Sequence, residues 1–402
     1  MATVEEQVLR TIERLSLSSP LKVGDVELRN RNIMSAMTRN RSVPVNVPND
    51  ANVEYYAQRA EGGAGLIVSE GVLISPQGTT WPHAPGLWSK EQTEGWKRVT
   101  DSVHQAGGKI FAQLWHVGRI AHKDMPEQKK SGNPVQGPSP VAARGGEGQY
   151  ARFGMPKEDG HSIPVPLEDP RAVIDKFKVA AANAKEAGFD GIEITAGNGY
   201  LINQFLDNTS NHRTDEWGGS VENRARLGLE ITNALIDIWG PGRVGVKITP
   251  YGGYNDMGMT LDDTHSTFNY YVKELMALNI AYITIGRYVP NTPADIEIDG
   301  KKRATPHDVL EAYGPLFKQA GAGATTRLFI NGSLNPAEAN ELIGSGKMDG
   351  AVFGWLWIGN PDLQTRIEKG AELVFMPDVT QLYGSKTDTP HSGYTDYPKG
   401  AY

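Results

Sequence analysis

Short apolar runs alternate with helix-length segments along most of this 402-residue chain, and this alternation restricts the fold more than any other feature. Strands that alternate with helices favour parallel βαβ units, and eight such units predict a (β/α)8 TIM barrel. A barrel can use this much chain as one domain, so residues 1–402 are expected to form a single α/β domain. The predicted strands are Asn32–Ala36, Gly65–Ser69, Ile110–Gln113, Gly191–Ile194, Val244–Ile248, Tyr282–Ile285, Leu328–Asn331 and Gly350–Phe353. The clearest predicted helices are Gln92–Gln105, Pro170–Ala187, Val221–Ile238, Thr264–Leu278 and Pro336–Ser345.

Capping residues support several of these helices. Asn335 followed by Pro336 is typical of an N-cap with proline at the first helical position. The sequences AGGK (106–109) and AGFDG (187–191) place glycine just after a helix and before a strand, which is a C-cap signal.

Two segments depart from the alternation. Residues 116–169 follow the third predicted strand, are rich in Gly and Pro, and show no clear periodicity. A loop of this length is usually functional, so we expect an excursion, or lid, over the mouth of the barrel. Residues 377–402 are polar and are expected to form a strap over the surface.

Composition narrows the possible partners and chemistry. A net charge of -7 and the lack of a large basic cluster argue against nucleic acid, and no run of 18 apolar residues predicts a membrane span. The N-terminus lacks the apolar region of a signal peptide, which indicates a cytoplasmic protein.

There are no cysteines, so disulfides and thiolate catalysis are excluded. His116 and His212 lack partners at metal-ligand spacing, so no metal site is expected. A small-molecule substrate and a monomer or homodimer are predicted.

Active sites of such barrels form at the carboxyl ends of the strands, and polar residues lie at those positions. The loops after the seventh and eighth strands commonly bind phosphate through backbone N–H groups, and Gly332 and Gly354 permit close approach there, although both could equally form plain tight turns. Gly240, Gly242 and Gly245 match G-x-G-x-x-G, but they lead from a helix into a strand, the reverse of the dinucleotide-binding order. The candidate positions are Met37-Thr38-Arg39, Glu70-Gly71, Gln113–His116, Thr195–Tyr200, Lys247, Tyr251-Gly252, Asn331-Gly332-Ser333 and Gly354-Trp355.

The chain resembles the Old Yellow Enzyme family of FMN-dependent ene-reductases over nearly its whole length. The resemblance lies in segments such as LKVGDVELRNRNIMSAMTRNR, SEGVLISPQG, AGFDGIEI and RVGVKITPYGGYNDMG, in family order. The run NQFLDNTSNHRTDEWGGSVENR is especially specific. The resemblance implies that FMN lies across the strand ends, that NADPH or NADH is the reductant, and that the substrate is an α,β-unsaturated carbonyl compound.

The resemblance also implies roles for individual residues. Tyr200 matches the proton donor, where the plain alternative is an aromatic ring packed under the loop. Asn198 matches a group that holds the substrate oxygen, and Trp115 and Tyr383 would shape the pocket. The positions that match flavin contacts are Ala36 and Met37 (backbone), Thr38 (flavin carbonyl), Gly71 and Gln113 (ring), and Gly332, Ser333 and Gly354 (phosphate).

Three positions depart from the family pattern. Thr195 replaces a His that binds the substrate oxygen, and threonine is shorter than histidine. Three arrangements would accommodate this change: the substrate sits deeper, a water fills the gap, or Asn198 alone binds the substrate oxygen. Lys247 replaces an Arg near the flavin pyrimidine, keeping the charge but losing the planar fork. Trp355 replaces an Arg on the FMN phosphate, which removes a contact worth about 1.5–3 kcal/mol.

These departures leave three functions open. The first is an ene-reductase with a specialised substrate. The second is a flavin-bound isomerase, dehydrogenase or cyclase. The third is an FMN-free non-redox cyclase or binding protein, for which Trp355 is the main motive.

Overall fold

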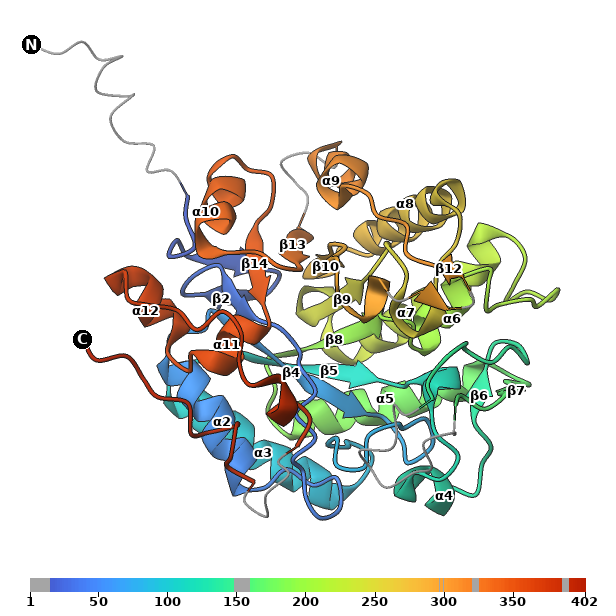
Figure 1. The fold of residues 1–402 in the computed structure, drawn as a ribbon, viewed down its shortest axis with the longest axis horizontal. Helices are drawn as coiled ribbons and strands as arrows, with labels where there is room; N and C mark the ends of the chain where they lie inside the picture. The colour runs from blue at the N-terminus through green and yellow to red at the C-terminus, as the bar shows by residue number, and fades with distance from the viewer. Residues whose placement is uncertain (1–14, 148–159, 296, 299, 320–324, 385–389) are drawn as a thin grey trace, which may run out of the picture.

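The computed structural model describes residues 15–147, 160–295, 297–298, 300–319, 325–384 and 390–402. Eight parallel strands close into a barrel in the order β10-β13-β14-β3-β4-β5-β8-β9, and helices surround it (Figure 1). The predicted (β/α)8 architecture is confirmed. Each neighbouring pair of strands is parallel, so the carboxyl ends of all eight meet at one mouth.

All eight predicted strands are present, and their amino-terminal boundaries agree within one residue. The largest differences are at the carboxyl ends, where β4 and β5 run further than the apolar pattern indicated. There the chain keeps pairing through polar or aromatic residues, because both faces of a barrel strand are buried. The barrel strands are β3 (Asn32–Met34), β4 (Leu66–Leu73), β5 (Ile110–Trp115), β8 (Gly191–Ala196), β9 (Val244–Ile248), β10 (Tyr282–Gly286), β13 (Arg327–Asn331) and β14 (Gly350–Phe353).

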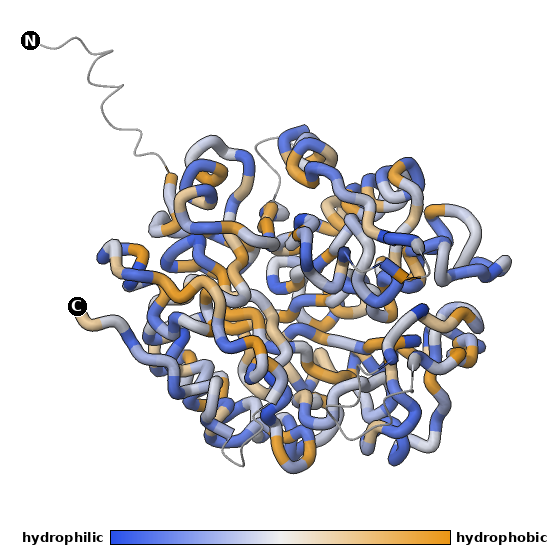
Figure 2. The backbone as a smooth tube through the Cα atoms, in the orientation of Figure 1, coloured by the Kyte–Doolittle hydropathy of each residue, from blue (hydrophilic) through white to orange (hydrophobic). Residues whose placement is uncertain are grey.

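The helices form a layer around the strands, and their apolar faces pack against the barrel. Figure 2 shows hydrophobic segments concentrated in the strands at the centre of the molecule. Sequence patterns missed α2 and α9, which complete the layer. The helices are α2 (Asp50–Glu61), α3 (Lys90–Gln105), α4 (Pro126–Lys130), α5 (Arg171–Glu186), α6 (Leu201–Leu206), α7 (Val221–Trp239), α8 (Leu261–Ala277), α9 (Val309–Gln319), α10 (Pro336–Gly344), α11 (Trp355–Gly359) and α12 (Leu363–Lys369).

The predicted caps are confirmed. The Asn335 side chain accepts the Glu338 backbone N–H at 2.9 Å, at the start of α10. After α5, the N–H of Gly188 (φ +83°) donates to the carbonyl of Lys185, and the N–H of Phe189 donates to Ala184. This is a Schellman motif, which requires the left-handed conformation that glycine adopts without strain.

A hairpin closes the amino-terminal end of the barrel. Its strands β1 (Leu21–Val23) and β2 (Val26–Leu28) are antiparallel, and their buried side chains join a second hydrophobic cluster. Phe111, Tyr282 and Phe329 from the barrel interior complete this cluster, and the Tyr282 and Phe329 rings stack at 4.7 Å. The far end of the barrel is therefore a packed floor.

The described part of the 116–169 excursion contains the short helix α4 and the parallel two-residue strands β6 (Gln136–Gly137) and β7 (Val165–Pro166). A second short pair, β11 (Glu297–Ile298) and β12 (Lys301–Lys302), follows β10. The strap contacts α2, where the Gln58 amide donates to the Thr395 carbonyl at 2.9 Å. No helix in the described ranges combines the length and apolar character needed to span a bilayer.

Candidate active site

An aromatic cluster stands at the mouth beside β4 and β5. The Trp115 and Tyr200 rings meet edge to face, with centroids 5.0 Å apart. Tyr383 from the strap packs on Trp81 at 4.5 Å, and both belong to the hydrophobic cluster that contains Trp115 and Tyr200. The structure thus brings together three residues predicted from distant parts of the chain: the candidate proton donor and both candidate pocket walls.

The turn that carries Asn198 and Tyr200 is held from both sides. Asn198 has a left-handed backbone (φ +56°), and its N–H donates to the Thr249 hydroxyl at 2.6 Å. The Asn255 side chain donates to the Asn198 carbonyl at 2.7 Å. A Cβ atom on Gly199 would lie 2.7 Å from the Cβ of Asn255, so only glycine fits between the two loops. This packing sets the direction in which Tyr200 leaves the turn.

An ion-pair network links the excursion to the Asn255 loop. The buried Asp256 carboxylate accepts a hydrogen bond from Arg144 Nε at 2.9 Å and forms an ion pair with Arg303 Nε at 2.9 Å. Arg119, buried next to the start of the excursion, donates to the Asp256 backbone carbonyl at 3.0 Å. Two arginines of the excursion and one that follows β12 (Lys301–Lys302) therefore hold the loop whose Asn255 contacts the turn that carries Asn198 and Tyr200.

The strap is held by the residues that directly follow Thr38. Arg39 Nε donates to the carbonyl of residue 382 at 3.0 Å, and Asn40 Nδ2 donates to that of residue 383 at 3.2 Å. Arg41 Nη2 donates to the carbonyl of residue 381 at 2.8 Å. Three successive residues thus bind three successive carbonyls, which connects the position of Tyr383 to the loop after β3.

Two buried side-chain donors at the strand ends, each the sole donor of its side chain, have no partner among the described residues. They are the Thr195 hydroxyl at the end of β8 and the Trp115 indole N–H at the end of β5. Thr195 is 5% exposed and Trp115 is 2% exposed. A buried polar group without a partner costs free energy, and such groups at a strand-end mouth are typical of ligand-binding positions.

A polar layer crosses the barrel beneath the mouth. Gln113 Nε2 donates to the Glu193 carboxylate at 2.7 Å, and Lys247 Nζ donates to the Ser35 hydroxyl at 3.2 Å. Burial raises the pKa of Glu193, an effect that Lys247 opposes. Burial likewise lowers the pKa of Lys247, and Glu193 opposes that shift. The two charged groups therefore stabilise each other in the interior.

The loop after β3 and the glycine of β4 complete this side. Ala36, Met37 and Thr38 are half-buried. Gly71 pairs with Gln113 across β4 and β5. A Cβ atom on Gly71 would lie 2.5 Å from the Trp115 ring, so the glycine makes room for that indole.

The loops after β13 and β14 form the candidate phosphate side. Gly332 (φ +117°) and Ser333 (φ +47°) have left-handed backbones, and a Cβ atom on Gly354 would lie 3.0 Å from the Met37 sulfur. Trp355, the first residue of α11, is 39% exposed. These loops permit close approach, and the side chain at 355 is an indole instead of a cation.

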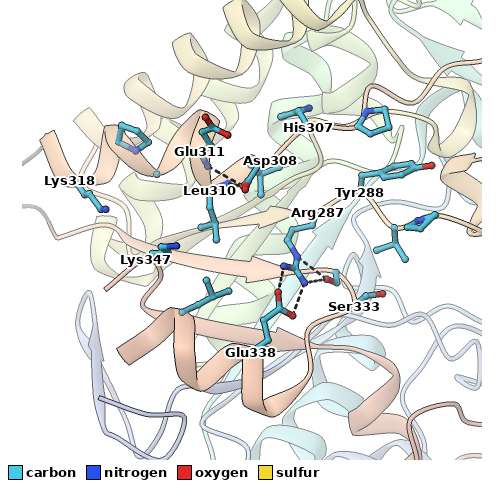
Figure 3. A pocket seen from close by; sticks show the side chains of 18 residues that line it. Arg287, Tyr288, His307, Asp308, Leu310, Glu311, Lys318, Ser333, Glu338 and Lys347 are labelled. Atoms are coloured by element: carbon cyan, nitrogen blue, oxygen red, sulfur yellow. Dashed lines mark hydrogen bonds and ion pairs between the residues drawn. The ribbon is translucent and has the colours of Figure 1, made fainter. Parts of the chain in front are cut away.

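Arg287, which follows β10, lies beside this loop. It donates to the Gly332 carbonyl at 3.1 and 2.9 Å and to the Glu338 carboxylate at 2.6 and 3.2 Å. Its charge is therefore already paired. Figure 3 shows this arrangement at the edge of a cavity of about 1060 Å³ between the loop after β10 and helices α9 and α10. This cavity flanks the mouth, and none of its lining residues belongs to the aromatic cluster or the polar layer.

Sequence analysis missed Glu193, Asn255 and Asp256. Glu193 lies between Ile192 and Ile194, an alternation that normally places the polar residue toward solvent. In a closed barrel the second face is the interior, so a charge inside a buried parallel strand was the available signal. The Asn255 and Asp256 contacts depend on loop geometry, which no local pattern encodes.

The donor set fits FMN. Lys247 offers an ammonium, and Gln113 and Thr38 offer an amide and a hydroxyl toward ring carbonyls and nitrogens. Thr195 and Trp115 supply buried donors that lack a partner. The backbone N–H groups of Gly332, Ser333 and Gly354 can donate hydrogen bonds to a phosphate. The residues present therefore suit the flavin ring better than the phosphate, which would depend on these backbone donors.

Comparisons with known proteins identify the family of the chain. A family model described as NADH:flavin oxidoreductase / NADH oxidase family matches residues 16–373. The NADP-dependent oxidoreductase lnbE of Aspergillus flavus is 37% identical over 393 residues, covering 95% of this chain and 96% of that protein. A probable flavin mononucleotide-dependent alkene reductase of Leishmania infantum is 36% identical, covering 94% and 96%. The structure of the Old Yellow Enzyme homologue from Zymomonas mobilis superimposes with a TM-score of 0.81 at 35% identity, covering 95% and 99%.

Proposed function

Because the chain belongs to the NADH:flavin oxidoreductase / NADH oxidase family, the Old Yellow Enzymes, we propose which of its residues perform the family's reaction. The chain is an FMN-dependent oxidoreductase that reduces the C=C bond of an α,β-unsaturated carbonyl with NAD(P)H. The observation that carries the residue assignment is the convergence of Tyr200, Trp115 and Tyr383 at the end of β5. The neighbouring strand β8 ends near Thr195, whose hydroxyl has no partner among the described residues. A carbonyl substrate in this pocket would meet aromatic walls, a hydrogen-bond donor and a phenol.

When bound, FMN would supply the hydride for Cβ of the substrate, with NAD(P)H as the source of reducing equivalents. Tyr200 donates its phenolic proton to Cα, which completes the saturated product, and regains a proton from solvent. A free tyrosine has a pKa of about 10, so it is protonated at neutral pH and able to donate.

Asn198 and Thr195 would donate hydrogen bonds to the substrate oxygen, where negative charge develops as hydride arrives. Both are held by the protein: Thr195 by β8, and Asn198 by Thr249 and Asn255. Trp115 and Tyr383 would confine the substrate between aromatic faces and exclude water.

The remaining residues would hold the cofactor. Lys247 and Gln113 would bind the pyrimidine edge of the flavin, and Thr38 would donate to a carbonyl of the same ring. The backbone of Ala36 and Met37, together with Gly71, would face the ring. Gly332, Ser333 and Gly354 would bind the phosphate through backbone N–H groups, with Trp355 beside it in place of a cation.

Thr195 supports a specialised substrate. Threonine is shorter than histidine and cannot become cationic, so its hydroxyl reaches less far from β8. We therefore propose that the substrate carbonyl lies deeper in the mouth than it would against a histidine. The described excursion, tied to the Asn255 loop through Asp256, would act as the lid over this substrate.

Family membership favours ene-reduction over the two alternatives that the departures left open. Trp355 is the one departure that pointed to an FMN-free protein, and family membership outweighs it. A cytoplasmic location, the monomeric or dimeric state, and the choice between NADPH and NADH stay predictions.

The purified protein provides the test. It is expected to be yellow, to lose the visible flavin absorption when mixed anaerobically with NADPH or NADH, and to regain it on addition of 2-cyclohexenone or a bulkier enone. A colourless protein that takes up no added FMN would overturn the cofactor assignment. A flavin that is reduced by the nicotinamide and stays reduced with every enone would overturn the ene-reductase assignment.

A further inference from the structure

Glu193 is a buried carboxylate inside the barrel, directly below the residues assigned to the flavin. It is 2% exposed and lies in the middle of β8. Its register partners are Gln113 on β5 and Gly245 on β9. An isolated charge there would be strongly destabilising, so its partners have to compensate for it.

The compensation comes from two sides. Gln113 donates to one carboxylate oxygen at 2.7 Å, and the Thr284 hydroxyl approaches the other at 3.4 Å. Lys247 supplies the opposite charge from β9: it pairs in register with Thr195, two residues beyond Glu193 on the same barrel face. Lys247 is 6% exposed, and the Ser35 hydroxyl accepts one of its three N–H donors.

The contact with Glu193 determines what Gln113 presents to the mouth. An ionised carboxylate only accepts hydrogen bonds, so the amide nitrogen of Gln113 must face it. The amide oxygen and the second N–H remain available. An acceptor beside a donor complements a ring edge that carries N–H and C=O groups side by side, which is the pyrimidine edge of a flavin.

Resting on the proposed function, we infer that Glu193 is a positioning residue for the flavin, orienting Gln113 and balancing the charge of Lys247 so as to lower the reduction potential of bound FMN. Reduction adds negative charge to the flavin. Lys247 stabilises that charge, and the Glu193 carboxylate opposes it through a low-dielectric interior. Removal of the carboxylate charge should therefore favour the reduced cofactor.

Potentiometric titration of the FMN-loaded enzyme tests this inference. Glu193→Gln keeps the shape and removes the charge, and it should raise the ratio of reduced to oxidised flavin at a fixed potential about tenfold, a shift of ~30 mV for a two-electron couple. Lys247→Met should shift the ratio in the opposite direction. The double variant should return toward the wild-type value, because both charges are gone.

Asp190→Asn is a matched control. Asp190 precedes β8 at the opposite end of the barrel and pairs with Lys109 at 3.0 Å and His104 at 2.9 Å. Its loss should reduce stability and leave the flavin potential unchanged. A shift in this variant equal to that of Glu193→Gln would show that the potential follows general destabilisation, and would overturn the inference.

Equal potentials in wild type and Glu193→Gln would also overturn it. If Glu193→Gln does not fold, Lys247→Met is compared with the double variant, and the double variant must have the higher potential. A wild-type protein that binds no FMN would instead contradict the proposed function, so the two failures are distinguishable.

Discussion

The two sides of the barrel mouth are built differently. Beside β4, β5 and β8, the aromatic cluster and the Asn198 turn are held by interlocking hydrogen bonds from the excursion, the strap and the loop after β9. Beside β13 and β14, the candidate phosphate loops rely on open backbone, Arg287 is paired with Glu338, and Trp355 is exposed. The difference indicates that the side proposed for proton transfer is the more rigidly held, and that the side proposed for the phosphate is the more open.

Tyr200→Phe probes the rigid side most strongly. Loss of the phenolic proton should lower turnover with an enone about 10²- to 10⁴-fold, while reduction of the flavin by NAD(P)H stays unchanged. Stopped-flow measurement separates the two half-reactions. Unchanged enone turnover in this variant would remove Tyr200 from the mechanism.

Trp355→Arg probes the open side. A guanidinium on the phosphate should tighten FMN binding by about 1.5–3 kcal/mol, a factor of roughly 10–150 in Kd. Titration of apoprotein with FMN measures this directly. Trp355→Lys is the matched control, with charge but no planar fork, and should give a smaller gain. If neither cation tightens binding, the phosphate does not lie at residue 355.

The pH dependence of stability tests whether the rigid side depends on hydrogen bonds made by a neutral His116 ring. Its Nδ1 accepts the Gly118 N–H at 3.1 Å, and its Nε2 lies 2.8 Å from the Gln77 amide oxygen, an arrangement that requires the neutral ring. Burial lowers the pKa of His116 from 6.5 to about 3. The unfolded chain therefore binds more protons between these pH values, and the folded state loses stability as pH falls through that window.

Between pH 7 and pH 5 this loss should be about 2 kcal/mol in the free energy of unfolding. Urea unfolding of wild type and His116→Gln measures it, and the variant should show a smaller loss over the same interval. An equal loss in both proteins would mean that His116 does not titrate during unfolding.

Thr195→Val should have the smallest effect and sharpens the substrate assignment. Because the Thr195 hydroxyl has no partner among the described residues, valine breaks no described hydrogen bond of the protein and should leave Tm nearly unchanged. Loss of one hydrogen bond to the substrate should raise KM by a factor of about 2–12, corresponding to 0.5–1.5 kcal/mol. A variant with wild-type KM would show that Asn198 binds the substrate oxygen alone.

The alternation of strands and helices predicted the barrel and all eight strands, because each pattern depends on local burial. The family resemblance then selected residues at the strand ends, and the structure brings Trp115, Tyr200 and Tyr383 into one cluster. What could not be predicted depends on contacts between distant segments: the Asp256 network, the arginines that hold the strap, and the partnership of Glu193 with Gln113. An isolated charge in an apolar strand gives no information about its partner on the next strand.

The β1–β2 hairpin restricts how ligands reach the flavin at the mouth of the barrel. With one end of the barrel filled by Phe111, Tyr282 and Phe329, a ligand of the flavin must arrive and depart on the same side. We expect the nicotinamide and the enone to bind in turn at one site over the flavin. Such an enzyme should give parallel lines in double-reciprocal plots, with each substrate inhibiting the other at high concentration.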